Sequence, residues 1–335
     1  MQLFGMTQAA LEAWALSRGA SPGAARVHAR DRLAQAAQRP LPERPARALL
    51  QAEGPGAELP RADLAADPDG TVRFAVHLDG GAVVETVVIS HLSRRTVCLS
   101  SQAGCARGCV FCETGRLGLL RNLDASEIVA QYAIAARHLG VRPQNVVFMG
   151  MGEPLDNLEE VLRAIAVLRE PAGFAVPERR ITVSTVGIVP RMPELYARTR
   201  AQVAVSLHAV DERRRLALLP VARRWPLAEL RGMIARAPRT VLLQWTLIEG
   251  VNDADADADA LVRFCAGLDV RVNLIPLNPG PVREQRAPPM SRCRAFQKRL
   301  ADAGVRTLLR MPHGRQIGGA CGQLAGTRRT AAPAE

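Results

Sequence analysis

Lysine is nearly missing from this chain, because Lys298 is the only one among 335 residues. Aromatic residues are also scarce, at 4%. No run of 18 or more apolar residues occurs, and residues 1–23 lack the basic-then-apolar pattern of a secretory signal, which argues against a membrane span and against export. We therefore expect a cytoplasmic protein without a membrane partner, whose seven cysteines are thiols, thiolates or metal ligands rather than a disulfide framework.

Arginine supplies nearly all of the positive charge. Lys and Arg together number 44 against 32 Asp and Glu, which gives a formal net charge of +12. Such a balance favours a polyanionic partner, with nucleic acid first, because basic side chains neutralise phosphates. The contents of 48% hydrophobic and 23% charged residues are typical of a globular chain, and 335 residues suffice for a barrel-sized domain with an accessory segment.

Apolar, β-branched segments alternate with amphipathic helical patterns in the larger part of the chain. Six of these segments are predicted strands: 96–99, 145–149, 180–184, 202–206, 240–247 and 270–275. Strands separated by helices run parallel through right-handed crossovers. The pattern therefore predicts an α/β fold, either an open barrel or a doubly wound sheet, with its chemistry at the carboxyl ends of the strands.

The N-terminal part of the chain has a different pattern. Residues 8–18 and 24–37 are predicted to be short helices, and the Ala-, Pro- and Gly-rich run 52–70 is typical of a linker. We therefore predict an N-terminal helical accessory region with its linker over residues 1–70.

A β-hairpin is predicted next. Two β-branched segments, 71–78 and 82–89, flank Asp79-Gly80-Gly81, a strong turn signal, so the hairpin should occupy residues 71–90. The core domain would then cover residues 91–325, and residues 326–335 would form a tail.

Two helix starts carry capping signals. Asp124 with Glu127 predicts a capping box for a helix that Gly140 ends, and Asn157 with Glu160 predicts a similar start for the next helix.

The most specific signal is a cysteine motif. Cys105, Cys109 and Cys112 form C-x3-C-x2-C directly after a predicted strand, and Gly104 and Gly108 let the backbone wrap closely around a ligand. Three thiolates suit a soft metal or an iron–sulfur cluster, whereas a structural zinc site needs four ligands and no nearby Cys or His completes the set. Three ligands would leave one iron of a 4Fe–4S cluster open, which is a catalytic arrangement.

The other cysteines differ in their surroundings. Cys321 lies in a glycine-rich, predicted exposed segment, 318–322, and is a candidate nucleophile. Cys98 lies in a predicted strand and could be a small core residue, and Cys265 and Cys293 lie in predicted helices and are interpreted as structural. The string GMGEP, residues 150–154, lacks the third glycine of a dinucleotide fingerprint.

Longer strings in the chain match a known family. From Glu85 to Leu324 they include VETVVI, TVCLSSQAGC, CVFCETG, RNLDASEIVAQ, VVFMGMGEPLDN, ITVSTVGIVP, VAVSLHA, LIEGVND, VNLIPLNP and ACGQLAG. The cysteine loop resembles that of radical S-adenosylmethionine (SAM) enzymes, and the wider chain resembles the RNA adenosine methyltransferases of the RlmN/Cfr family. The resemblance implies a partial (β/α)6 radical-SAM barrel, preceded by the small helical accessory domain and the β-hairpin extension.

The resemblance also implies cofactors and their ligands. Cys105, Cys109 and Cys112 would hold one 4Fe–4S cluster, whose open iron binds SAM, and two SAM molecules would be used per turnover. The implied SAM contacts lie in the GMGEP turn or at predicted strand ends: Gly152, Glu153, Ser184, Ser206, Leu207, His208 and Asn278. A lone histidine is more often structural, and Ser or Asn often caps a strand end, so position and string carry these assignments.

In the family's mechanism, Cys321 takes a methyl group from one SAM. A second SAM, reduced by the cluster, gives a 5'-deoxyadenosyl radical that removes hydrogen from the S-methyl group, and the resulting carbon radical adds to adenine. Cys98 then attacks the Cys321 sulfur, a transient disulfide releases the methylated base, and Glu85 accepts the proton lost from the ring carbon. Alternatively, Glu85 is a structural carboxylate, exposed or paired with a base such as Arg94.

The implied function is methylation of an adenosine ring carbon in RNA: carbon 2 of an adenine in 23S rRNA, and in tRNA, with electrons from a flavodoxin or ferredoxin. Gln244-Trp245 in place of the usual Glu-Tyr, and HGRQ at 313–316 in place of Arg-Gly and acidic residues, leave carbon 8 as an alternative target. Two other hypotheses are a radical SAM enzyme acting on a peptide or small molecule and a non-catalytic Fe–S or zinc RNA-binding module. Binding alone would need neither Cys98 nor Cys321.

Overall fold

The computed structural model describes residues 2–39, 58–91 and 94–326, so almost all of the predicted tail and part of the predicted linker lie outside the described residues. Ten strands form one sheet whose spatial order follows the chain. They are β1 (Ala62–Ala66), β2 (Val72–His77), β3 (Val83–His91), β4 (Arg94–Cys98), β7 (Asn145–Phe148), β8 (Ile181–Thr185), β9 (Gln202–Ser206), β10 (Val241–Leu247), β11 (Val270–Pro276) and β12 (Thr307–Leu309).

Helices connect and cover these strands. They are α1 (Gln8–Leu16), α2 (Pro22–Ala36), α4 (Glu113–Leu117), α5 (Ala125–Leu139), α6 (Leu158–Arg169), α7 (Met192–Arg198), α8 (Glu212–Leu218), α9 (Leu227–Ala235), α10 (Asp255–Cys265) and α11 (Met290–Asp302). None of the described helices is long and apolar enough to cross a membrane.

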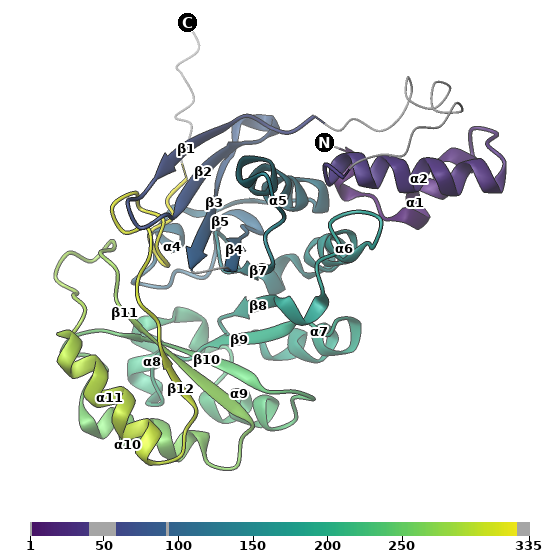
Figure 1. The fold of residues 1–335 in the computed structure, drawn as a ribbon. Helices are drawn as coiled ribbons and strands as arrows, with labels where there is room; N and C mark the ends of the chain where they lie inside the picture. The colour runs from purple at the N-terminus through teal and green to yellow at the C-terminus, as the bar shows by residue number, and fades with distance from the viewer. Residues whose placement is uncertain (1, 40–57, 92–93, 327–335) are drawn as a thin grey trace, which may run out of the picture.

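The topology distinguishes between the two α/β folds that the sequence left open. Strands β1 to β4 are antiparallel neighbours, and each strand from β4 to β12 is parallel to the next. The strand order never reverses, so right-handed crossovers place the connecting helices on one side of the sheet, as in a barrel. Figure 1 shows α5, α6 and α7 along the outer side of the strands. The predicted partial barrel is confirmed.

Local signals predicted most elements correctly. The six predicted barrel strands are β4 and β7 to β11, and the predicted hairpin is β2 and β3, joined through a turn at Asp79–Gly81. Asp124 and Glu127 form the predicted capping box of α5, and Gly140 ends that helix in the left-handed conformation, with φ 64°. The predicted N-terminal helices are α1 and α2, which pack on a small separate core of Leu3, Leu11, Ala29 and Leu33.

Other predictions were wrong. The run predicted to be a linker contains β1, which pairs with β2 and extends the hairpin to three strands. Asn157 is at the predicted N-cap position of α6, but its side chain makes no capping bond and donates instead to the carbonyls of Ser101 and Leu123. Glu160 accepts from the backbone N–H of Ala125 at the start of α5. Both side chains therefore join neighbouring segments, a choice that depends on packing rather than on local sequence.

Three short strands have no clear sequence signal. β5 (Gln102–Cys105) and β6 (Gly118–Asn122) form a separate two-stranded sheet around the cysteine motif, and β12 has only three residues. β5 contains no β-branched residue, so period and propensity could not identify it.

Candidate active site

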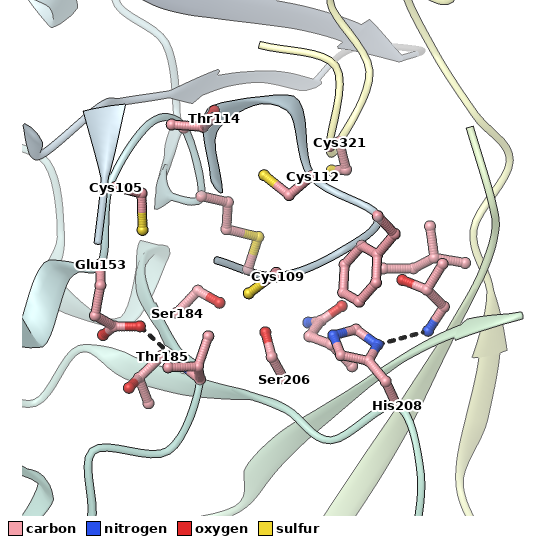
Figure 2. Close-up of a pocket in the computed structure, with 18 of the residues that line it drawn as sticks. Cys105, Cys109, Cys112, Thr114, Glu153, Ser184, Thr185, Ser206, His208 and Cys321 are labelled. Atoms are coloured by element: carbon pink, nitrogen blue, oxygen red, sulfur yellow. Dashed lines mark hydrogen bonds between the residues drawn. The ribbon is translucent and has the colours of Figure 1, made fainter. Parts of the chain in front are cut away.

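The cysteine motif encloses one side of a cavity at the carboxyl ends of the barrel strands. Cys105 ends β5, and Cys109 and Cys112 lie in the loop that leads into α4. Figure 2 shows the three side chains around the same cavity. Glycine is required at residue 104, since φ is +78° and a Cβ atom there would overlap the carbonyl oxygen of Gly118. The tight β5–β6 bend thus brings the three sulfurs to one cavity.

The electrostatics of these thiols fit a cationic group. Burial raises the pKa of Cys105 to about 12, and nearby acidic groups and Cys112 add to the effect. Burial and the neighbouring thiols also raise the pKa values of Cys109 and Cys112. Three desolvated thiols become thiolates only beside a strong positive charge such as iron.

The kind of donor suits a cluster as well. Among the described residues, no three His, Cys, Asp or Glu side chains lie close enough together to hold a single metal ion. A 4Fe–4S cluster takes each cysteine sulfur on a different iron, so the sulfurs need not converge on one point. The donor set therefore fits the predicted cluster.

The GMGEP turn after β7 forms another part of the cavity wall. At Gly150 a Cβ atom would lie 2.7 Å from the Ser100 hydroxyl, and at Gly152, where φ is +98°, it would lie 2.6 Å from Gln102. The backbone N–H of Glu153 donates to the Gln102 side chain at 2.8 Å. These contacts require glycine at both positions and hold Glu153 at the cavity wall.

Glu153 is a buried carboxyl with two fixed partners. Its side chain is 3% exposed and accepts from the backbone N–H groups of Leu155 at 3.0 Å and Val186 at 2.8 Å. Burial raises its pKa to about 7, against these hydrogen bonds, which lower it. A buried carboxyl of this kind suits the binding of a cation, such as an ammonium, because the positive charge offsets the desolvation of the carboxylate.

His208 is held as a neutral imidazole. Burial lowers its pKa to about 3, and its Nδ1 accepts from the backbone N–H of Thr246 at 2.9 Å. The proton of the neutral ring must therefore be on Nε2, which leaves one N–H donor for a ligand. The Phe111 ring meets the imidazole edge-on at 4.8 Å, and His208 itself adopts φ 57°, an unusual backbone conformation for a non-glycine residue.

All but one of the predicted SAM contacts line the cavity. Six of the seven line it: Gly152, Glu153, Ser184, Ser206, His208 and Asn278. Leu207 does not, because its side chain is fully buried and its backbone N–H donates to the carbonyl of Gln244. The strand-end positions thus converge as parallel strands require.

Cys321 joins this cavity to a second one. Its side chain is exposed and lines both, and Cys98, in β4, lines the second. Both are free thiols, and burial followed by the nearby Cys321 raises the pKa of Cys98. Asn278 donates to the Cys321 carbonyl at 3.0 Å, and Arg315 donates to Asn278 at 2.8 Å.

Carboxylates of the three-stranded hairpin hold the Cys321 segment on both sides. Before Cys321, Asp67 accepts from the N–H of Gln316 at 3.0 Å and Asp69 accepts from that of Gly314 at 2.9 Å. After Cys321, Glu85 accepts from the N–H groups of Ala325 at 2.8 Å and Gly326 at 3.3 Å. Figure 1 shows this C-terminal segment, in yellow, running from β12 to the hairpin.

Comparisons with known proteins agree with this geometry. The Radical SAM superfamily model matches residues 99–261. A probable RNA methyltransferase of Sorangium cellulosum is 48% identical over 88% of this chain and 79% of its own length. The dual-specificity RNA methyltransferase RlmN of Syntrophobacter fumaroxidans is 45% identical over 76% of this chain and 77% of its own. The chain belongs to the RlmN/Cfr family.

A solved structure extends the agreement with this family to the whole fold. The crystal structure of a radical SAM methyltransferase from Sphaerobacter thermophilus is 38% identical and superposes with a TM-score of 0.86, covering 96% of this chain and 98% of its own. The chain is thus a SAM-dependent radical SAM methyltransferase, in a superfamily that uses a 4Fe–4S cluster and SAM.

Glu85 forms an ion pair, but not with Arg94, the base suggested by the sequence. Arg73 on the adjacent strand β2, rather than Arg94, forms the ion pair, with 2.5 Å between Nη1 and Oε1. The Glu85 side chain is 5% exposed and does not line the cluster cavity. The residue directly opposite Glu85 is Ala75. Arg73 lies two positions from Ala75 on the same face of β2 and reaches Glu85 diagonally, so the register of the strands determines this ion pair.

Sequence reasoning missed Asp67 and Asp69 as residues of the site. Their run, Asp-Pro-Asp-Gly-Thr at 67–71, is a turn signature in which short carboxylates bond local N–H groups. It does so here, since Asp69 accepts from Thr71 at 2.8 Å. The second carboxylate oxygen of each aspartate accepts a hydrogen bond from the segment that carries Cys321. No local sequence pattern predicts these long-range bonds.

Proposed function

We propose that this chain methylates carbon 2 of an adenine in RNA, with 23S rRNA and tRNA as substrates. The observation that carries the proposal is the meeting of four cysteines: the three of the motif and Cys321 line one cavity, and Cys321 also lines a second cavity with Cys98. The named activities of the relatives, RNA methyltransferase and dual-specificity RNA methyltransferase RlmN, support RNA as the substrate. The net charge of +12 suits it as well.

Different residues of the cavity bind the cluster and SAM. Cys105, Cys109 and Cys112 hold a 4Fe–4S cluster, while Glu153 and the polar strand-end side chains hold SAM. Together these groups supply one-electron chemistry, which a ring carbon of adenine requires because it is neither acidic nor nucleophilic. Two SAM molecules are used per turnover, and a flavodoxin or ferredoxin supplies electrons.

Cys321 and Cys98 act in succession. Cys321 carries the methyl group, and the adjacent Gly322, with φ +86°, gives its backbone a conformation that other residues rarely adopt. Cys98 then attacks the Cys321 sulfur: a sulfur–sulfur bond forms as the bond from Cys321 to the product carbon breaks, and that carbon keeps the electron pair and takes up a proton to complete the methyl group. By resemblance, Glu85 is assigned the proton lost from the adenine ring carbon, although in this structure it lies outside both cavities and is paired with Arg73. The external donor reduces the disulfide.

Nucleoside analysis tests the function directly. Cluster-loaded protein, SAM, a reductant and total RNA from cells lacking the gene are expected to yield 2-methyladenosine, detected by mass spectrometry of digested RNA. Formation of 8-methyladenosine would contradict the carbon assignment. An unchanged nucleoside profile, together with 5'-deoxyadenosine formation, would contradict RNA as the substrate.

Glu153 gives a pH-dependent prediction. With a pKa of about 7 the carboxyl is about half protonated at pH 7, and a bound ammonium lowers that pKa. S-adenosylhomocysteine binding at pH 7 should therefore release up to about half a proton, and its affinity should rise with pH as Glu153 ionises. Calorimetry in two buffers of different ionisation enthalpy measures the release. An undiminished release in Glu153→Gln would contradict the role.

A further inference from the structure

Gln244, near the middle of β10, has a buried side-chain amide without a partner. The residue is 4% exposed, and neither its Nε2 nor its Oε1 has a hydrogen-bond partner among the described residues. Its backbone carbonyl, in contrast, accepts from the N–H groups of Leu207 and His208. An amide removed from water without partners costs free energy, so native proteins rarely keep one without a use.

The chain satisfies its other fully buried amides. Gln131, 0% exposed, bonds Thr86 and both backbone groups of Ser100. Asn252, also 0% exposed, donates to the carbonyls of His208 and Thr246 and accepts from the N–H of Ile248. These two amides are thus fully bonded, whereas both polar atoms of Gln244 are without a partner among the described residues.

Gln244 faces the place where the two cavities meet. It lines the cluster cavity and also the second cavity, together with Asn278 and Cys321, which line both. Its partner in β9 is Ser206, a predicted SAM contact, and the second cavity also contains Cys98. A ligand bound by Gln244 therefore lies within reach of the reacting groups.

We propose that Gln244 binds the edge of an adenine through a pair of hydrogen bonds. A carboxamide offers one donor and one acceptor side by side, which matches the exocyclic amine and an adjacent ring nitrogen of adenine. The inference rests on the proposed function, in which two molecules carry adenine: SAM and the target nucleotide. Both sources present the same edge chemistry, and only binding measurements separate them.

Equilibrium binding tests the inference without turnover. Cluster-loaded protein, handled without oxygen, is titrated with S-adenosylhomocysteine, and then, saturated with that compound, with adenosine 5'-monophosphate. Gln244→Met keeps the length of the side chain and removes both hydrogen bonds, and Gln244→Leu is the second variant should Met not fold. We expect a roughly 5- to 100-fold weaker Kd for one of the two probes.

Tyr196→Phe is the matched control. The Tyr196 hydroxyl is also buried without a partner, yet it lines neither cavity, so its removal should leave both Kd values unchanged. Weakened S-adenosylhomocysteine binding assigns Gln244 to SAM, and weakened nucleotide binding assigns it to the target base. Unchanged binding of both probes by a folded Gln244 variant would overturn the inference, whereas failure of unmodified protein to bind S-adenosylhomocysteine would contradict the proposed function instead.

Discussion

Cys321→Ala is expected to lower the rate of RNA methylation by at least about 10³-fold, as removal of a covalent nucleophile does in other enzymes. The side chain is exposed at the meeting of two cavities, and no other described cysteine lines both. Mass spectrometry of digested RNA measures the product. Mass spectrometry of the tryptic peptide should also show a methyl group on Cys321 in unmodified protein and none in the variant.

Cys293→Ala serves as the matched control for this experiment. Cys293 is a fully buried thiol of α11, and its loss should cost about 1 kcal/mol of unfolding free energy while methylation continues. The Cys321→Ala protein should keep its iron, because Cys321 is not one of the three proposed cluster ligands. Methylation at the unmodified rate by Cys321→Ala would exclude a methyl carrier at this position.

Cys109→Ala is expected to lose the cluster. Two remaining thiols cannot hold a 4Fe–4S group, so iron should fall from about four atoms per chain to less than one. Formation of 5'-deoxyadenosine from SAM should fall by at least about 10³-fold, since the cluster supplies the electron. Metal analysis measures the first effect, and chromatography of the nucleoside products measures the second.

The comparison with Cys321→Ala separates the two cysteine roles. Loss of iron is expected only when a motif cysteine changes, whereas loss of RNA methylation is expected in both variants. A Cys109→Ala protein that retains its iron and sulfide would place the cluster elsewhere in the chain. Zinc in the unmodified protein, in place of iron, would contradict the cluster assignment altogether.

The barrel was predictable because its signals are local. Parallel strands such as β9 and β10 are buried on both faces, so they consist of short runs of apolar residues that can be recognised one at a time. Crossover handedness then limits the possible topologies. β1 was missed because Ala62–Ala66 has little β propensity by itself, and its pairing with β2 stabilises it.

The cysteine side of the cavity was predictable for a similar reason. Cys105, Cys109 and Cys112 lie within eight consecutive positions, and a loop of that length with Gly104 can fold in few ways around a ligand. The proposed SAM side required resemblance, because Glu153 and His208 are single residues that follow different strands. Their burial, which raises one pKa to about 7 and lowers the other to about 3, is a property of the assembled barrel.

By itself, the sequence determined the cysteine loop, the hairpin and the succession of strands and helices, because each depends on residues a few positions apart. Only the tertiary structure determined how Cys321 is held. Glu85 bonds Ala325 across 240 positions, and Asp69 bonds Gly314 across 245. It also left the Gln244 amide without a partner. Contacts of this range depend on how the partial barrel places distant segments, and no local pattern of residues encodes them.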